Sequence, residues 1–237
     1  MRLNLLFSFI ILFGAIPIVA QTDTVNNGPQ TLGTQARLSG SVFTFFMQAR
    51  GSQYFKEEWM EGSVVLSSGE KVTGELLRYN AYLDELLWMP AFGSNPVMVD
   101  KGLVDHFFIN TMHDTLLFRK TDYLPGIRDI GKGIFLQELY TGEYSLFAHR
   151  KVVQKRESVE SIGNSTFARP YIQPETDYYM ISNRGDVLAF SRLGNRRFSR
   201  LFEGRERDVR RILREEGIRI SDERGLIQAI QLIDRAK

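Results

Sequence analysis

The segment GSVVLSSGEKVTGELLR, residues 62–78, decides the fold class of this chain. Two runs rich in β-branched and aliphatic residues, 62–66 and 71–78, flank the polar turn Ser67-Ser68-Gly69-Glu70. Such runs are typical of strands, and Gly69 supplies the positive φ that a tight turn requires. The segment therefore predicts a β-hairpin.

The hairpin pattern continues along the chain as far as Arg192. Runs of β-branched and aromatic residues alternate with turn clusters at roughly 8 to 12 residues, the spacing of antiparallel sheets. The polar residues 158–174 contain two prolines, which predicts a loop. Residues 41–192 are expected to form a mainly β domain, an antiparallel hairpin meander folded as a sandwich or a partly open barrel. Its predicted strands after the first hairpin are 85–89, 97–99, 104–109, 115–119, 134–140, 144–153, 177–182 and 187–191.

The C-terminal segment, residues 193–237, changes to helical periodicity. Residues 205–216 place apolar side chains on one stripe and stop at Gly217, which tolerates the left-handed conformation of a helix end. Ser221 is positioned to cap a second helix, whose apolar face contains Leu226, Ile227, Ile230 and Ile233. A pair of α-helices is therefore predicted, docked on the sheet by its apolar stripes.

The N-terminal residues 1–20 have the pattern of a secretory signal peptide. Arg2 precedes an apolar run over residues 5–13, and the small residue Ala20 fits the position before the cut. The run is shorter than the ~20 apolar residues that a membrane-spanning helix needs. Residues 21–40 are rich in Thr, Asn, Gln and Gly, which predicts a flexible leader. We expect an exported protein, periplasmic or secreted, without a transmembrane segment after signal cleavage.

The composition excludes several kinds of site. The 237 residues include no cysteine, so disulfides, thiolate zinc sites and a cysteine nucleophile are absent. The formal net charge of +2 gives no long-range attraction for nucleic acid, so no nucleic-acid partner is expected.

The candidate chemical motifs are sparse. His106 and His113 lie close in sequence, each beside an aspartate, but nothing fixes a third ligand, so no metal or cofactor is predicted. No Gly-x-Ser-x-Gly elbow appears, and no catalytic residue is predicted.

Arginine is concentrated in the C-terminal segment. Residues 196–237 hold twelve Lys and Arg against eight Asp and Glu. Helical spacing brings Glu206 near Arg210 and Arg211 near Glu215, which neutralises part of this charge. A solvated helix face is one interpretation, and a surface for an anionic partner or membrane is the other.

Two parts of the chain carry a pattern seen in other proteins. In the hairpin region these residues are Trp59, Gly62–Leu66, Gly69, Arg78–Asn80 and Asp84–Leu86, and in the tail they are Phe198 and Phe202 ahead of the C-terminal helices. In these residues the chain resembles exported β-rich proteins of Bacteroidota-type bacteria, for which no activity is established. The resemblance implies an envelope location and carries over no catalytic residue.

These observations together predict a non-enzymatic binding or structural protein of the bacterial cell envelope, with an envelope protein or an anionic surface as its partner. One alternative is a periplasmic carrier that holds an apolar ligand in a curved sheet. Another is an envelope hydrolase without a recognisable motif. The predicted ligand or partner surface lies where aromatic hairpins meet loops, and consists of Tyr79, Tyr82, Trp88, Tyr140 and Tyr144.

Overall fold

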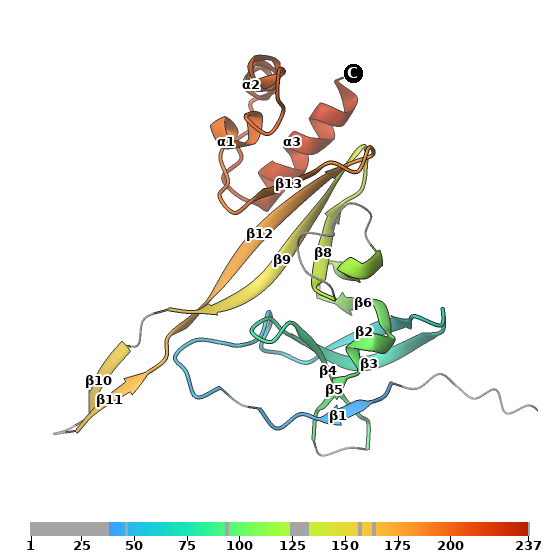
Figure 1. Cartoon of the computed structure of the whole chain (residues 1–237), viewed down its shortest axis with the longest axis vertical. Coiled ribbons are helices and arrows are strands. Elements are labelled where there is room, and N and C mark those ends of the chain that lie inside the picture. The colour runs from blue at the N-terminus through green and yellow to red at the C-terminus, as the bar shows by residue number, and fades with distance from the viewer. Residues whose placement is uncertain are drawn as a thin grey trace, which may run out of the picture. The chain divides into compact units, whose positions relative to one another are not determined.

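Eleven strands form one antiparallel sheet in the computed structural model (Figure 1), in the order β1-β5-β4-β3-β2-β6-β7-β8-β9-β12-β13. The structure describes residues 38–45, 47–92, 95–123, 133–155, 158–162 and 165–236. The strands are β1 (Gly40–Val42), β2 (Met60–Leu66), β3 (Lys71–Asn80), β4 (Glu85–Met89), β5 (Val97–Val99), β6 (Val104–Asn110), β7 (Thr115–Lys120), β8 (Phe135–Tyr140), β9 (Tyr144–Gln154), β12 (Ile172–Ser182) and β13 (Val187–Phe190). Short 3-10 turns, η1 (Lys101–Leu103) and η2 (Thr121–Tyr123), follow β5 and β7.

The predicted antiparallel hairpin meander is confirmed, and its sheet is not closed. The hairpin β2–β3 forms as the sequence indicates, with Gly69 at φ 88° in the turn. After β5 the chain returns through η1, so that β6 pairs with the other side of β2. The signal-peptide and leader predictions lie outside the described residues, apart from Leu38 to Gly40.

A cluster of aromatic rings fills the concave side of the first part of the sheet. Tyr79, Phe107, Phe118 and Phe135 are each at most 1% exposed, although they come from β3, β6, β7 and β8. The rings of Phe107 and Phe118 stack at 4.8 Å between centroids, and Phe107 meets Phe135 edge-on at 5.0 Å. Contact between Tyr79 and Phe135, whose strands are not neighbours, requires the sheet to curl.

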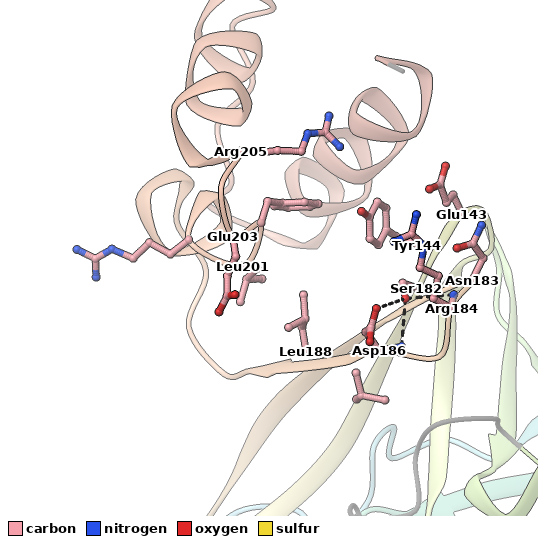
Figure 2. Close-up of a pocket in the computed structure, with 13 residues that line it drawn as sticks. Glu143, Tyr144, Ser182, Asn183, Arg184, Asp186, Leu188, Leu201, Glu203 and Arg205 are labelled. Atoms are coloured by element: carbon pink, nitrogen blue, oxygen red, sulfur yellow. Dashed lines mark hydrogen bonds between the residues drawn. The ribbon is translucent and has the colours of Figure 1, made fainter.

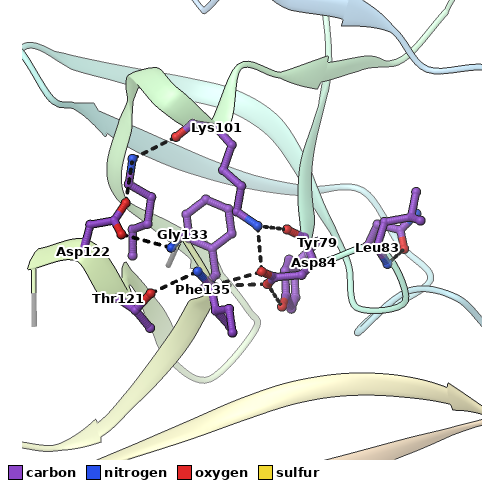
Figure 3. Close-up of polar contacts among 11 residues, drawn as sticks. Tyr79, Leu83, Asp84, Lys101, Thr121, Asp122, Gly133 and Phe135 are labelled. Atoms are coloured by element: carbon purple, nitrogen blue, oxygen red, sulfur yellow. Dashed lines mark hydrogen bonds and ion pairs between the residues drawn. The ribbon is translucent and has the colours of Figure 1, made fainter. Parts of the chain in front are cut away.

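Asp84, at the corner between β3 and β4, fixes this curl (Figure 3). Its carboxylate accepts hydrogen bonds from the Tyr79 hydroxyl (2.6 Å) and from the Phe135 N–H (3.2 Å), and it pairs with Lys101 Nζ (2.6 Å). Asp84 adopts φ 58°, a left-handed conformation that aspartate tolerates better than most residues. Burial, together with the charge and hydrogen bond of Asp84, raises the pKa of Tyr79 well above 10.0, so the hydroxyl remains a donor.

The predicted loop over residues 158–174 is wrong. Residues Ser158–Ile162 and Ser165–Arg169 form a separate two-stranded hairpin, β10–β11, and β12 begins at Ile172. Pro174 is tolerated in β12 because it lies opposite Val152, whose N–H bonds to Ala81 O (2.9 Å) instead of to β12. At such a non-bonded pair a proline removes no ladder hydrogen bond.

The helical segment contains the two predicted helices and one more. Helix α2 (Glu206–Glu215) ends before Gly217, which has φ 67°, as expected. Helix α3 (Glu223–Arg235) is capped by Asp222, whose carboxylate accepts from the Gly225 N–H (2.8 Å); the prediction that Ser221 is the cap is therefore wrong. The additional helix, α1 (Asn195–Ser199), spans a single turn and lacks a recognisable stripe.

The helical segment packs on β9 and β12. Leu146, Ala148 and Met180 point to this face and form one core cluster with Ile230 and Ile233 of α3. The alternate residues Phe147, Tyr179 and Ile181 point to the other face. Because successive side chains of a strand point to opposite faces of the sheet, β9 and β12 contribute to a packed cluster on each face.

An ion pair joins α3 to the sheet beside this cluster. Arg150 of β9 pairs with both carboxylate oxygens of Glu223, and the longer of these contacts is 2.8 Å. The Arg150 Nε donates to Gln137 (2.7 Å), and the Tyr178 hydroxyl donates to Glu223 (2.9 Å). Burial acts to raise the pKa of Glu223, but the hydrogen bonds and charge of Arg150, with Tyr178, hold it below 4.5.

His149 should make the free energy of unfolding depend on pH. Burial lowers the pKa of His149 below 6.5; the charges of Asp84 and Asp177 oppose this shift, while those of Lys151 and Lys101 add to it. Because the unfolded chain then binds the proton more readily, stability decreases as pH falls below about 6.5.

We therefore expect His149→Gln to lose less stability than the wild type between pH 7 and pH 5, as measured by urea unfolding. The control is His113→Gln, because His113 is exposed in the β6–β7 turn. Equal losses in the wild type and His149→Gln would contradict the assignment.

Candidate functional site

The five predicted surface aromatics lie in two separate regions. Tyr79 is in the core, Tyr82 stacks on Phe45 at 6.5 Å, and Trp88 donates its Nε1–H to Glu75; all three belong to the first core region. Tyr140 and Tyr144 instead flank the β8–β9 turn and pack against the helical core cluster. Of the five, Tyr144 lines a pocket beside the helices.

This pocket, which we call the hairpin-tip pocket, has a volume of about 780 Å³ (Figure 2). Three segments build it: the β8–β9 turn, the β12–β13 turn with the start of β13, and the connection from α1 to α2. The lining residues are Glu143, Tyr144, Ser182, Asn183, Arg184, Asp186, Val187, Leu188, Arg200, Leu201, Phe202, Glu203 and Arg205.

Short-range hydrogen bonds fix the two hairpin tips. The Ser182 hydroxyl accepts from the Asp186 N–H (3.1 Å) and from the Arg184 N–H (3.3 Å), and Gly185 takes φ 88° in the turn. The Asn183 N–H donates to the Glu143 carbonyl (2.9 Å), which joins one tip to the other. Side-chain hydrogen bonds therefore close the β12–β13 turn, and a backbone hydrogen bond holds it against the β8–β9 turn.

The last turn of α3 is hydrogen-bonded to the β8–β9 turn. Asp234 accepts hydrogen bonds from the Tyr140 hydroxyl (3.0 Å) and the Glu143 N–H (3.1 Å). Burial is the main reason that the pKa of Tyr140 is raised, and the hydrogen bond to Asp234 adds to it. Tyr140 thus acts as a protonated donor that holds the tip in place, beside the pocket.

Aromatic and aliphatic side chains form the floor of the hairpin-tip pocket. The Tyr144 ring meets the buried Phe202 edge-on at 5.4 Å, and Phe202 in turn packs on Phe198 at 5.2 Å. Leu188 and Leu201 are half-buried and face the same space (Figure 2). These apolar side chains form the floor, and the remaining lining residues are polar or charged.

The rim carries charges of both signs. Arg184, Arg200 and Arg205 contribute three guanidinium groups, and none of them pairs with a carboxylate in the described part of the chain. Asp186 and Glu203 add carboxylates; Asp186 accepts from the Ser182 hydroxyl (3.1 Å). The pocket therefore offers charged donors and acceptors around its apolar floor.

Most residues of this pocket are not indicated by the sequence. Its residues come from positions 143–144, 182–188 and 200–205, and no spacing in the sequence indicates that the three segments meet. The turn over residues 183–186, between the predicted strands 177–182 and 187–191, could have pointed to one wall, and the Phe198/Phe202 pair to another.

The histidines lie elsewhere. His106 Nδ1 is 2.8 Å from its neighbour Asp105, and His113 lines a different groove of about 870 Å³ beside the β6–β7 turn. Within the described residues, no group of three His, Asp or Glu side chains is placed to bind a metal ion. The described helices include none that is long and apolar enough to cross a membrane.

The fold and the pocket define a mainly β protein with an open antiparallel sheet, three C-terminal helices and a mixed apolar and charged surface site. Comparison with models of protein families, with curated proteins and with solved structures finds no match to this chain. The resemblance to exported Bacteroidota-type proteins therefore stays a prediction.

Proposed function

We propose that this chain is an exported, non-enzymatic binding protein of the bacterial cell envelope, whose hairpin-tip pocket receives a short segment of a partner protein. The observation that carries the proposal is the construction of the pocket: an apolar floor around Tyr144 and Leu188, held by two cross-linked hairpin tips. A preformed site of this kind binds without the cost of ordering its own loops.

The composition of the pocket favours a polypeptide over a purely apolar ligand. A bound segment presents backbone N–H and C=O groups and side chains of both charges, which match the guanidinium and carboxylate groups of the rim. One apolar or aromatic side chain of the partner would occupy the floor beside Tyr144. Central aromatic anchors within a polar rim are typical of energetically important contacts in protein interfaces.

The alternative of an apolar carrier receives less support. The concave side of the sheet is filled by Phe107, Phe118 and Phe135, each 0% exposed, which leaves no room at that position for a ligand. The hydrolase alternative also receives less support, because the Asp186 carboxylate of the pocket accepts a hydrogen bond from the Ser182 hydroxyl (3.1 Å) and so helps to close its own turn.

We expect a photo-crosslinking amino acid at Leu188 to capture a discrete partner protein in the bacterium that makes the chain. Leu188 is half-buried in the pocket, so its replacement reaches only a partner that enters there. Leu103, which is 44% exposed on η1, is the control position. Crosslinked products are measured by gel shift and identified by mass spectrometry.

Charge reversal at the rim supplies the second measurement. Arg184→Glu should reduce the crosslink yield at Leu188 by roughly five-fold or more, because it places a carboxylate where the partner meets a guanidinium. Arg207→Glu, on α2 outside the pocket, is its matched control. Equal products at Leu188 and Leu103, or equal loss with both charge reversals, would contradict the proposal.

A further inference from the structure

A strongly basic groove lies in the helical segment and shares no lining residue with the hairpin-tip pocket. Arg196 of α1, Arg210 and Arg214 of α2 and Arg219 of the following linker line a space of about 550 Å³. Among the described residues that line it there is no Asp or Glu. We call this the arginine groove, and its four guanidinium groups define it.

The four guanidinium groups lack carboxylate partners. Across the described chain none of them lies within ion-pair distance of an acidic side chain. Arg211, on the same helix α2, pairs with both Asp208 (3.6 Å) and Glu215 (3.4 Å). Asp208 and Glu215 therefore compensate Arg211 and not the groove. The sequence spacing predicts a pair between Glu206 and Arg210, but the Arg210 Nε donates to the backbone carbonyl of Glu206 (3.1 Å) and not to its carboxylate.

The scaffold under these arginines is fixed. The Asn195 side chain donates to Ile218 O (2.7 Å) and accepts from the Ile220 N–H (2.8 Å), so the linker is tied to α1 on either side of Arg219. Leu213, between Arg210 and Arg214, is 1% exposed and anchors α2 in the core. The backbone positions of the four arginines are thus set by packing before any ligand binds, which lowers the cost of binding.

We propose that the arginine groove binds a ligand that carries a diphosphate group. The four guanidinium groups repel one another, and a multivalent anion bound between them would offset this repulsion because each group attracts it. The planar guanidinium fork matches phosphate oxygens with two parallel hydrogen bonds, and a diphosphate offers enough acceptors for several forks at once. A free metabolite and a lipid headgroup present the same chemistry, and the volume is that of a small-ligand site.

Titration of the purified chain with inorganic pyrophosphate, followed by calorimetry at low salt, tests the site. We expect saturable 1:1 binding that weakens as salt is added. Arg214→Gln and Arg219→Gln should each weaken binding by roughly ten-fold, the usual effect of losing a charge-assisted hydrogen bond. Arg211→Gln should change it by less than about two-fold, because Arg211 lies outside the groove.

Unchanged urea unfolding midpoints identify the variants that are folded and can be compared. Absence of saturable binding, an equal loss with Arg211→Gln, or equally tight binding of sulfate would overturn the proposal.

Vesicles whose lipids carry a diphosphate headgroup then distinguish the source of the ligand. Vesicle binding that pyrophosphate displaces supports a lipid, and pyrophosphate binding without vesicle binding supports a soluble ligand. Vesicle binding that pyrophosphate does not displace counts against the diphosphate site.

Discussion

Asp84→Asn is expected to lower the free energy of unfolding by about 2 to 3 kcal/mol. Asparagine has nearly the same shape and tolerates the same left-handed backbone, so the change removes the charge and little else. Lys101 then loses its carboxylate partner, and the hydrogen bonds from Tyr79 and Phe135 lose their charged acceptor. Urea unfolding followed by circular dichroism measures the loss.

The matched control is Asp114→Asn, at an exposed turn between β6 and β7. Asp114 forms hydrogen bonds to Thr111 through its backbone atoms alone, so we expect a change within about 0.5 kcal/mol. Equal stability of Asp84→Asn and the wild type would mean that packing of the aromatic rings alone holds the curl of the sheet.

Arg150→Leu is expected to lower the free energy of unfolding by roughly 2 to 3 kcal/mol, because it leaves the half-buried Glu223 carboxylate without its cation. The double variant Arg150→Leu/Glu223→Leu should recover a large part of this loss, since no unpaired charge remains near the α3 docking surface. Chemical denaturation of the four members of this double-mutant cycle gives the coupling energy. A strictly additive cycle would show that the ion pair does not hold α3 to the sheet.

The stabilisation that the Arg150–Glu223 ion pair contributes depends on pH. The pKa of Glu223 in the folded chain lies below 4.5, so the unfolded chain takes up the proton first as pH falls. The contribution of the pair is complete above about pH 5 and is lost as pH falls below about 4.5. We expect Arg150→Leu to lose this part of the acid sensitivity, as measured by unfolding between pH 6 and pH 3.5.

The parts of the fold that sequence reasoning predicts are those with local causes. Strand alternation and the glycine turns at Gly69 and Gly185 indicate the hairpins, and the apolar stripe of residues 226–233 indicates α3. The β10–β11 hairpin was not predicted, because the polar composition and the two prolines of residues 158–174 indicate a loop. The cap at Asp222 was missed because two adjacent residues both have capping side chains, and only the backbone geometry selects between them.

The parts that could not be predicted depend on contacts between distant residues. Asp84 meets Phe135 across 51 positions of sequence, and no local pattern reports that contact. The density of arginine in the tail indicates a basic surface, but four of these arginines line one groove while Arg211 is neutralised on another side of α2. The packing of the helices determines which arginines line the groove, and the sequence does not report that packing.

The packing of α3 also bears on when the chain can fold during synthesis. Ile230 and Ile233 complete a core whose other half, Leu146 and Met180, emerges from the ribosome much earlier. Until α3 has left the ribosome, that half remains an uncovered apolar surface, which is the kind of surface that chaperones recognise. The hairpin of β9 and β12 should therefore acquire protease resistance only after α3 has emerged.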